Sequence, residues 1–369
     1  MRRVVFVNRY FHPDHSATSQ MASDLAFHLA RKGWEVAAIT SRQLYDDARA
    51  DLRSSVEEGV RIERVWSTRF GRAGLFGRAL DYATFYLSAF FAIRREREAT
   101  IVAMTDPPLL SVVAALASRD VVNWIQDLFP EVAQALGIRV PRFVRRIRDW
   151  SLSKARANVV LGELMARRVP KAVVIHNWAP LIQMADGGWQ MAETKPSAIR
   201  HLPSGGRVVV GYSGNLGRAH DAETIAAAIR LLPDVKFVFT GGGSKLPMIC
   251  NANVEIRPYV PREELAESLS SVDVHLVSLL PQLEGLIVPS KFYGVLAVGR
   301  PVIFIGARDG ELARVIEECR CGFVVETAEE LAQAILKTDP EMGARGRALY
   351  LARFAPEHAF AAWERVLSG

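Results

Sequence analysis

Short apolar runs alternate with helix-like segments along almost the whole chain, and this alternation is the strongest constraint on its fold. In the first half, Val4–Val7 reads as a buried strand, Ser19–Lys32 as a helix and Val36–Thr40 as a second strand. The same order restarts at Val208–Tyr212, after a stretch that is rich in proline and glycine. Strands that alternate with helices favour parallel sheets covered by helices, so we predict an α/β protein.

The restart divides the 369 residues into two parts, which agrees with a typical domain size of roughly 100–200 residues. We predict one Rossmann-like domain over residues 1–180, a linker over 181–206, a second Rossmann-like domain over 207–344 and a final helical region over 345–369. The carboxyl ends of the strands of the two domains would face each other across a cleft. Half of the residues are hydrophobic, so each domain can bury a core.

Cysteine usage and hydropathy indicate where the protein works. Three cysteines are too few for a disulfide framework, and their spacing does not suit a metal site. The sequence shows no signal peptide and no apolar run of the roughly 20 residues that a spanning helix needs. We therefore expect a cytoplasmic protein, with a peripheral position on the inner face of the cytoplasmic membrane as an alternative.

Positive charge is concentrated in the first half of the chain. Residues 1–180 hold 27 Lys and Arg against 18 Asp and Glu, whereas the remaining residues hold 19 against 22. Leu80–Ile93 is nearly all apolar between arginines, and Arg139–Arg148 carries five arginines opposite Phe143 and Ile147. We predict a buried helix for the first segment and a solvated helix for the second, with contact with an anionic inner membrane as the alternative. Nucleic-acid binding is not expected, because no nucleic-acid motif is present.

Polar side chains follow two predicted strands of the first domain. The loop after the first strand, NRYFHPDHSAT, has no glycine and so lacks the Gly-x-Gly-x-x-Gly turn of nicotinamide dehydrogenases. His12, Asp14 and His15 in this loop, and Asp127 after the predicted strand Val121–Ile125, fall where open α/β sheets bind ligands. Asp127 is the catalytic candidate of this half, and the alternative is that it only caps the next helix.

The second domain carries two glycine-rich turns that follow predicted strands. The first is Ser213–Arg218, SGNLGR, and the second is Gly241–Lys245, GGGSK. Small residues allow a backbone to approach a diphosphate closely, and Arg218 could clamp a phosphate with two hydrogen bonds. The second turn is not a Walker A loop, because the Gly-Lys-Ser/Thr ending is missing.

A third segment, Leu283–Phe304, has the sequence LEGLIVPSKFYGVLAVGRPVIF and reads as an acidic loop, a short helix and a buried strand. The helix begins at Pro289 or Ser290, and a helix start presents free backbone N–H groups and a partial positive charge. Because Ser290 and Lys291 lie at this start, we interpret it as a phosphate-binding site. A capped helix with a solvated lysine is the alternative.

Together these features match the needs of a nucleotide-sugar donor site. The cations suit a diphosphate, whereas Glu284 and Glu311 suit the hydroxyls of a sugar or ribose. Arg and Lys side chains can neutralise a leaving diphosphate directly, so no metal ion is required. We expect a metal-independent enzyme without a bound cofactor, whose donor is a nucleoside-diphosphate sugar.

The chain resembles the family-4 retaining glycosyltransferases of the GT-B architecture, in particular the bacterial exopolysaccharide and colanic-acid type. The matching phrases span nearly the whole chain: HPDHSATSQMASDLAFHLARKGWEV, TDPPLLS, IQDLFPEVAQALG, IHNWA, YSGNLGRAHDAETI, TGGGSK, LEGLIVPSKFYGVLAVGRPVIF and DGELA. The resemblance implies a hexosyltransferase that moves a sugar to a lipid-linked or oligosaccharide acceptor with retention of configuration, in the biosynthesis of a bacterial surface polysaccharide. The second domain would hold the donor and the first the acceptor, and the last helix would cross back to the first domain.

The resemblance also implies roles for individual residues. Asp127, Arg218 and Lys291 would act in catalysis, with Asp127 near the transferred sugar. The donor side would consist of Ser16, Gly214, Asn215, Arg218, Gly242, Lys245, Glu284, Pro289, Ser290, Lys291 and Glu311. The acceptor side would consist of His15, Thr18, Gln126 and Asp127.

The chain departs from the family's pattern at two positions. Gly294 occupies the place of the second, ribose-binding glutamate of the Glu-x7-Glu motif, and His220 occupies that of a lysine after the first glycine turn. Glu284 or Glu311 would then bind the ribose. The alternatives to sugar transfer are a nucleotide-sugar epimerase of the same fold and a non-catalytic sugar-nucleotide-binding assembly protein, which the missing glutamate suggests.

Overall fold

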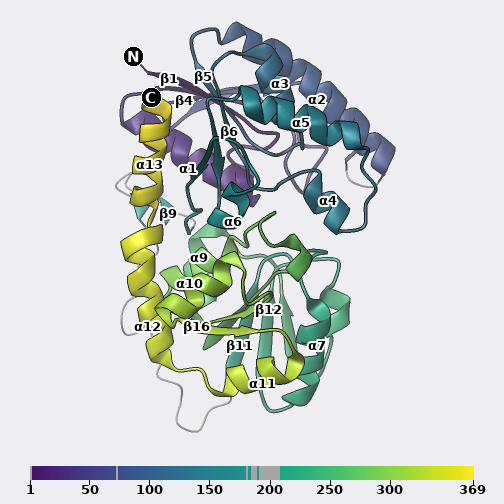
Figure 1. Cartoon of the computed structure of the whole chain (residues 1–369), viewed down its shortest axis with the longest axis vertical. Coiled ribbons are helices and arrows are strands. Elements are labelled where there is room, and N and C mark those ends of the chain that lie inside the picture. The colour runs from purple at the N-terminus through teal and green to yellow at the C-terminus, as the bar shows by residue number, and fades with distance from the viewer. Residues whose placement is uncertain (1, 72–73, 180–181, 184–188, 191–207) are drawn as a thin grey trace. The chain divides into compact units, whose positions relative to one another are not determined.

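The computed structural model describes residues 2–71, 74–179, 182–183, 189–190 and 208–369. Its contacts divide the chain into two units. The first unit consists of Met1–His176 and Ala359–Gly369, and the second of Asn177–His358. Each unit contains a sheet of mostly parallel strands with helices against it (Figure 1), which confirms the predicted α/β class.

The first unit is built on an eight-stranded sheet. Its strands are β1 (Arg3–Val7), β2 (Glu35–Ser41), β3 (Ser55–Glu57), β4 (Val60–Val65), β5 (Thr100–Ala103), β6 (Val121–Trp124), β7 (Ala157–Val160) and β8 (Ala172–Val174). Their order in the sheet is β3-β4-β2-β1-β5-β6-β7-β8, and only the pair of β3 and β4 is antiparallel. The chain winds in opposite directions on the two sides of β1, so the strand order reverses between β1 and β5. Open α/β sheets bind ligands at the carboxyl ends of the strands beside such a reversal.

Helices complete the first unit. They are α1 (Ala17–Arg31), α2 (Leu75–Arg95), α3 (Leu110–Ala117), α4 (Glu131–Ala135), α5 (Arg142–Lys154), α6 (Glu163–Ala166) and, from Ala359 onward, α13 (Pro356–Ser368). Two contacts fix α13 on this unit. Trp363 packs on Trp124 with 4.7 Å between the ring centroids, and His28 Nε2 lies 2.8 Å from Glu364 Oε1.

Helix α2 corrects the prediction of a buried helix over Leu80–Ile93. Phe85 and Ile93 are buried in the core, but Leu87 and Phe91 are 61% and 57% exposed. The apolar residues of this segment therefore lie on two faces of the helix, one packed against the sheet and one exposed to solvent.

The second unit is built on a six-stranded parallel sheet. Its strands are β11 (Val209–Ser213), β12 (Lys236–Thr240), β13 (Val254–Arg257), β14 (Val274–Ser278), β15 (Val302–Ile305) and β16 (Gly322–Val325). The order β13-β12-β11-β14-β15-β16 is the 3-2-1-4-5-6 order of a Rossmann sheet, with its reversal between β11 and β14. Two further short strands, β9 (Ile182–Gln183) and β10 (Trp189–Gln190), pair within the predicted linker; most of 181–206 lies outside the described residues.

Helices also cover the second sheet. They are α7 (Ala222–Leu231), α8 (Leu265–Ser270), α9 (Lys291–Ala297), α10 (Glu311–Cys319), α11 (Ala328–Leu336) and α12 (Pro340–Leu349), with shorter turns η2 (Leu246–Ile249), η3 (Arg262–Glu264), η4 (Pro281–Leu283) and η5 (Tyr350–Phe354). The core between the sheet and the helices α7 and α11 contains Phe237, Ile225 and Leu331. Within the described residues, no helix combines the length and the hydropathy needed to cross a bilayer.

Candidate active site

The two glycine-rich turns of the second unit pack backbone against backbone at the carboxyl ends of β11 and β12. The amide of Gly214 donates to the carbonyl of Thr240 at 2.8 Å, and the amide of Leu216 donates to that of Gly242 at 2.7 Å. Gly243 has φ +133°, and a Cβ there would lie 2.3 Å from the carbonyl oxygen of Leu216. The second turn can therefore contact the first only because this residue is glycine.

Lys291 reaches the first glycine turn from the start of α9. Its Nζ donates to the hydroxyl of Tyr212 and lies 3.8 Å from the centroid of that ring, and a Cβ on Gly214 would lie 3.8 Å from Nζ. The hydroxyl of Tyr212 donates in turn to the carbonyl of Asn215 at 3.1 Å, so the tyrosine ties the lysine to the turn. Burial lowers the pKa of the Lys291 ammonium to about 7.

The alternative of a capped helix with a solvated lysine is wrong on both counts. Ser290 occupies the N-cap position of α9 but makes no side-chain cap, and Lys291 is hydrogen-bonded and partly buried. Pro289 beside it is buried. Because α9 has only seven residues, its partial charge alone would be a weak anion site. The interpretation as a phosphate-binding site therefore depends on the cations and the glycine turns.

His220 follows the first glycine turn and contacts Lys245. The Nδ1 atom of His220 lies 2.7 Å from the carbonyl oxygen of Ser278, and the Nζ atom of Lys245 donates to the carbonyl of His220 at 2.8 Å. Burial, and then the charge of Lys291, lower the pKa of His220 to about 3, so this imidazole is neutral near pH 7 and Nδ1 carries its proton. Arg218, in the same turn, is exposed to solvent.

Glu284 and Glu311 meet at the start of α10. The amide of Glu311 donates to Glu284 Oε2 at 3.2 Å, whereas Glu284 Oε1 is buried and has no hydrogen-bond partner among the described residues. Burial, reinforced by the charges of Glu311 and Asp309 and partly offset by the hydrogen bond, raises the pKa of Glu284 to about 7. Glu284 thus keeps one buried oxygen that could bind a hydroxyl.

Gly294 lies inside α9 and is buried against α8. A Cβ there would lie 3.2 Å from Leu269 Cδ1, closer than an ordinary van der Waals contact. A side chain at this position would therefore require the side chain of Leu269 to shift.

In the first unit, the loop between β1 and α1 is organised by Asp14. Its buried carboxylate accepts hydrogen bonds from the amides of Ser16 at 2.8 Å and Tyr45 at 2.5 Å. His15, which we predicted on the acceptor side, turns to the surface and pairs with Asp46 at 2.8 Å, with both side chains more than half exposed. Its side chain therefore takes part in a hydrogen bond at the surface.

Ser16 occupies the N-cap position of α1. Its hydroxyl makes no cap, is buried and has no hydrogen-bond partner in the part of the chain that the structure describes. The hydroxyl of Thr18 accepts from Asn8 Nδ2 at 3.5 Å. A buried hydroxyl at the start of a 15-residue helix could bind an anionic or hydroxylated ligand.

Asp127 follows β6 at the carboxyl edge of the same sheet. The N-cap of α4 is Pro130, so the alternative in which Asp127 caps that helix is wrong. Partial removal from water, and then the charge of Asp106, raise the pKa of Asp127 to about 6, although the residue keeps an exposed surface. Gln126 beside it is buried.

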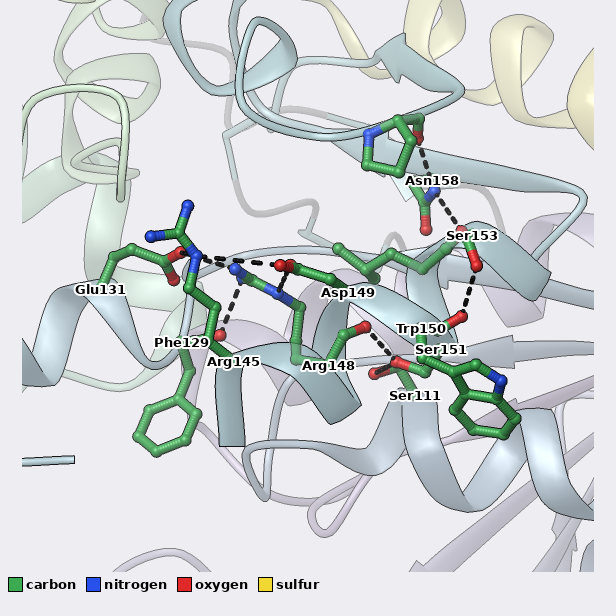
Figure 2. A network of polar contacts seen from close by, with 12 residues as sticks. Ser111, Phe129, Glu131, Arg145, Arg148, Asp149, Trp150, Ser151, Ser153 and Asn158 are labelled. Carbon is green, nitrogen blue, oxygen red and sulfur yellow. Dashed lines mark hydrogen bonds and ion pairs between the residues drawn. The ribbon is translucent and has the colours of Figure 1, made fainter. Parts of the chain in front are cut away.

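A small, mostly apolar cavity next to Asp127 is lined in part by a buried arginine that the sequence patterns did not single out. Met104, Leu110, Asn123 and Arg148 are among the residues that line it together with Asp127. Figure 2 shows how Arg148 is held: it donates to the carbonyl of Phe129 at 2.8 Å and to Glu131 at 2.6 Å. The sequence suggested a solvated arginine here, and no local signal distinguishes Arg148 from its exposed neighbours.

The structure brings most of the predicted donor residues together within the second unit. Contacts link Lys291 and Lys245 to the turns that contain Gly214, Asn215 and Gly242. Glu284 contacts Glu311 at the start of α10. Tyr212, which holds Lys291, was not predicted; its place directly before the glycine turn is the only signal that could have found it. In the described residues, no group of three or more His, Cys, Asp or Glu could hold a metal ion.

Comparisons with known proteins find related glycosyltransferases. Residues 16–179 match the family model described as a glycosyl transferase 4-like domain. The probable glycosyltransferase WbjE of Pseudomonas aeruginosa is 28% identical over 286 residues, which cover 70% of each chain. The putative colanic acid biosynthesis glycosyl transferase WcaI of Escherichia coli K12 is 21% identical over 348 residues, which cover 83% of this chain and 84% of that one.

Solved structures show the same fold over the whole chain. Sucrose-phosphate synthase from Thermosynechococcus elongatus has a TM-score of 0.74 at 16% identity and covers 99% of this chain and 98% of its own. WaaG, a glycosyltransferase involved in lipopolysaccharide biosynthesis, has a TM-score of 0.66 at 12% identity and covers 99% of this chain and 100% of its own. At these identities the likeness shows the fold alone, which is GT-B. Taken with the match of residues 16–179 and the named relatives, this fold makes the chain a glycosyltransferase of the GT-B architecture.

Proposed function

We propose that this glycosyltransferase moves a hexose from a nucleoside-diphosphate sugar to a lipid-linked or saccharide acceptor, with retention of configuration. The observation that carries the proposal is the position of Lys291 Nζ, held by Tyr212 beside Gly214 at the strand-order reversal of the second sheet. A positive charge next to closely packed glycine turns at this point of a Rossmann sheet suits a diphosphate. The description of WcaI as a colanic acid biosynthesis enzyme supports a role in the synthesis of a bacterial surface polysaccharide.

The donor would bind to the second unit. Its diphosphate would lie against the two glycine turns, where Lys291, Lys245 and Arg218 offset the phosphate charge. The ribose would bind to Glu284, whose Oε1 is buried and without a partner among the described residues. Buried acceptors are rarely left unpaired, so a ligand hydroxyl is the expected partner of this oxygen.

In the proposed reaction, the bond between the anomeric carbon and the diphosphate oxygen breaks while an acceptor hydroxyl attacks the same face of the sugar. The departing diphosphate takes the electron pair of the broken bond and receives the proton of the acceptor hydroxyl. Lys291 and Arg218 stabilise the negative charge that develops on the leaving group. Removal of one such donor costs roughly 3–4 kcal/mol of barrier in comparable sites.

The first unit would hold the acceptor near the carboxyl ends of β1 and β6. Asp127, on an exposed position beside the cavity, would orient the acceptor hydroxyl or the transferred sugar. Gln126, Thr18 and Ser16 are the other predicted contacts on this edge. His15 would contribute only if its pair with Asp46 opened.

The test begins with thermal shifts of the protein in a panel of nucleoside diphosphates and nucleotide sugars, which identifies the donor base. We then expect the nucleoside diphosphate to be released only when an acceptor is added, and release to be unaffected by a metal chelator. Nuclear magnetic resonance of the product should show the anomeric configuration of the donor. Donor binding without turnover over many acceptors, or a product of inverted configuration, would contradict the proposal.

A further inference from the structure

The outer faces of three helices in the first unit expose a group of large apolar side chains. Their exposed fractions lie between 39% and 61%. We call this group the α2-α3-α5 face, and its apolar members are Leu87, Phe91, Leu116, Phe143, Ile147 and Trp150. Single exposed apolar residues are ordinary on soluble proteins, but a contiguous group marks a binding surface.

The three helices form one continuous surface. Helix α3 contacts α2 on one side and α5 on the other, and the three lie side by side in Figure 1. Leu87 and Phe91 are four residues apart on α2, and Phe143 and Ile147 are four apart on α5, so each pair points to the same side of its helix.

The inner sides of these helices are fixed, so the exposed side chains cannot simply turn inward. Helix α2 buries Phe85 against the sheet. The hydroxyls of Ser111 on α3 and Ser151 on α5 lie 2.8 Å apart, and Arg148 anchors α5 to the carbonyl of Phe129 (Figure 2). The face is therefore a stable feature of the first unit.

The charge on this face is positive. Arg139, Arg142 and Arg146 are exposed and make no ion pair within the described residues. The only acid on α5, Asp149, is already paired with Arg145 and Arg148. Arginines alternate with Phe143, Ile147 and Trp150 along the exposed side of the helix. The partner must therefore combine negative charge with an apolar layer that these side chains can enter.

We propose that the α2-α3-α5 face binds the surface of an anionic phospholipid bilayer. The arginines of α5 and of the loop before it contact lipid phosphates, and the apolar side chains enter the head-group region, where Trp is favoured. The proposal rests on the first unit alone and not on the proposed transfer reaction. Its consequence would be to keep the protein beside acceptors that are anchored in the membrane.

The test is sedimentation of the full chain with vesicles, without any nucleotide. We expect binding to phosphatidylcholine vesicles that contain phosphatidylglycerol, weaker binding as salt is added, and little binding to phosphatidylcholine alone. The double variant Arg142→Gln with Arg146→Gln should bind about 25-fold more weakly, at roughly fivefold for each arginine near the surface. Phe143→Ser with Ile147→Ser should weaken binding by about tenfold through lost insertion.

Two matched variants of the second unit serve as controls. Arg230→Gln with Lys337→Gln removes the same charge, and Leu231→Ser with Leu336→Ser removes exposed apolar side chains of similar size. Both should bind vesicles like the wild type, and all variants should keep its melting temperature. The arginine variants test the proposal independently if the apolar variant does not fold.

Three results would overturn the proposal. The first is no binding to anionic vesicles at low salt, and the second is an equal loss in the control variants. The third is a dimer, seen by light scattering, that Phe143→Ser with Ile147→Ser dissociates, because the face would then bind a second copy of the chain.

Discussion

The two sheets share one winding but present different chemistry at their carboxyl edges. Both reverse their strand order beside the first strand, between β1 and β5 in the first unit and between β11 and β14 in the second. In the second unit, the turns at this point contain glycines at positive φ, with Lys291 close to Gly214. In the first unit, the loop after β1 has no glycine and is held by the carboxylate of Asp14.

We interpret this difference as a division of roles, in which the winding determines where a ligand can bind and the turn residues determine which ligand binds. Bare backbone and cations suit a diphosphate, whereas an aspartate with a raised pKa beside a cavity suits hydroxyl groups. The predictions below test this division of labour, from the largest expected effect to the smallest.

Replacement of Lys291 by alanine should have the largest effect. We expect kcat to fall by about 10²–10³-fold, because a preorganised charge beside the leaving group is lost. The fold should survive, since the variant removes a buried ammonium whose pKa is already lowered. Steady-state kinetics with Lys337→Ala, an exposed lysine of the same unit, provides the control, and a near-normal rate for Lys291→Ala would refute the assignment.

Asp127→Asn should affect the transfer step without affecting donor binding. We expect transfer to slow by about 10–100-fold, because a group that orients one reactant is altered, while the affinity for the nucleotide donor stays within about twofold. Calorimetric titration of donor and kinetics with acceptor measure the two quantities. A loss of donor affinity comparable to that of Lys291→Ala would contradict the division of roles between the two sheets.

Donor affinity should depend on pH through Lys291. Its pKa of about 7 in the free protein should rise when a diphosphate binds, because the anion favours the ammonium. Affinity is then constant below pH 7 and falls by up to about tenfold for each pH unit above it, until the pKa of the complex is reached. Titrations with a nucleotide sugar at several pH values check this, and Lys291→Gln should remove the dependence.

Tyr212→Phe should have the smallest effect. The variant keeps the ring but removes the hydroxyl that joins Lys291 to the carbonyl of Asn215. Loss of one hydrogen bond of about 0.5–1.5 kcal/mol corresponds to a two- to tenfold weaker donor affinity. Phe239→Leu, in the neighbouring strand against the same ring, tests packing alone, and an equal loss there would remove the special role of the hydroxyl.

Local patterns predicted the parts of the fold that depend on local physics. Alternating apolar runs predicted the strands β1, β2, β6 and β11 nearly to the residue, and turn chemistry located the glycine turns and the start of α9. Strand β3 was missed, because three residues of which two are exposed carry no usable periodicity. The family resemblance and the enzyme class agree with the comparisons.

The parts that the sequence could not give depend on contacts between distant residues. The partner of Lys291 is Tyr212, 79 positions away. Arg148 is held by the carbonyl of Phe129 and by Glu131 at the start of α4. His15 faces Asp46 rather than the sheet edge. The composition of α2 could not reveal its exposed side, because an apolar helix reads the same whether one face or all of it is covered.

The most direct test of the central claim is a crystal structure of the protein with a nucleoside diphosphate. We predict that the diphosphate lies on the glycine turns after β11 and β12, within hydrogen-bond distance of Lys291 Nζ. A diphosphate bound to the loops of the first sheet, with Lys291 still paired only with Tyr212, would contradict the account.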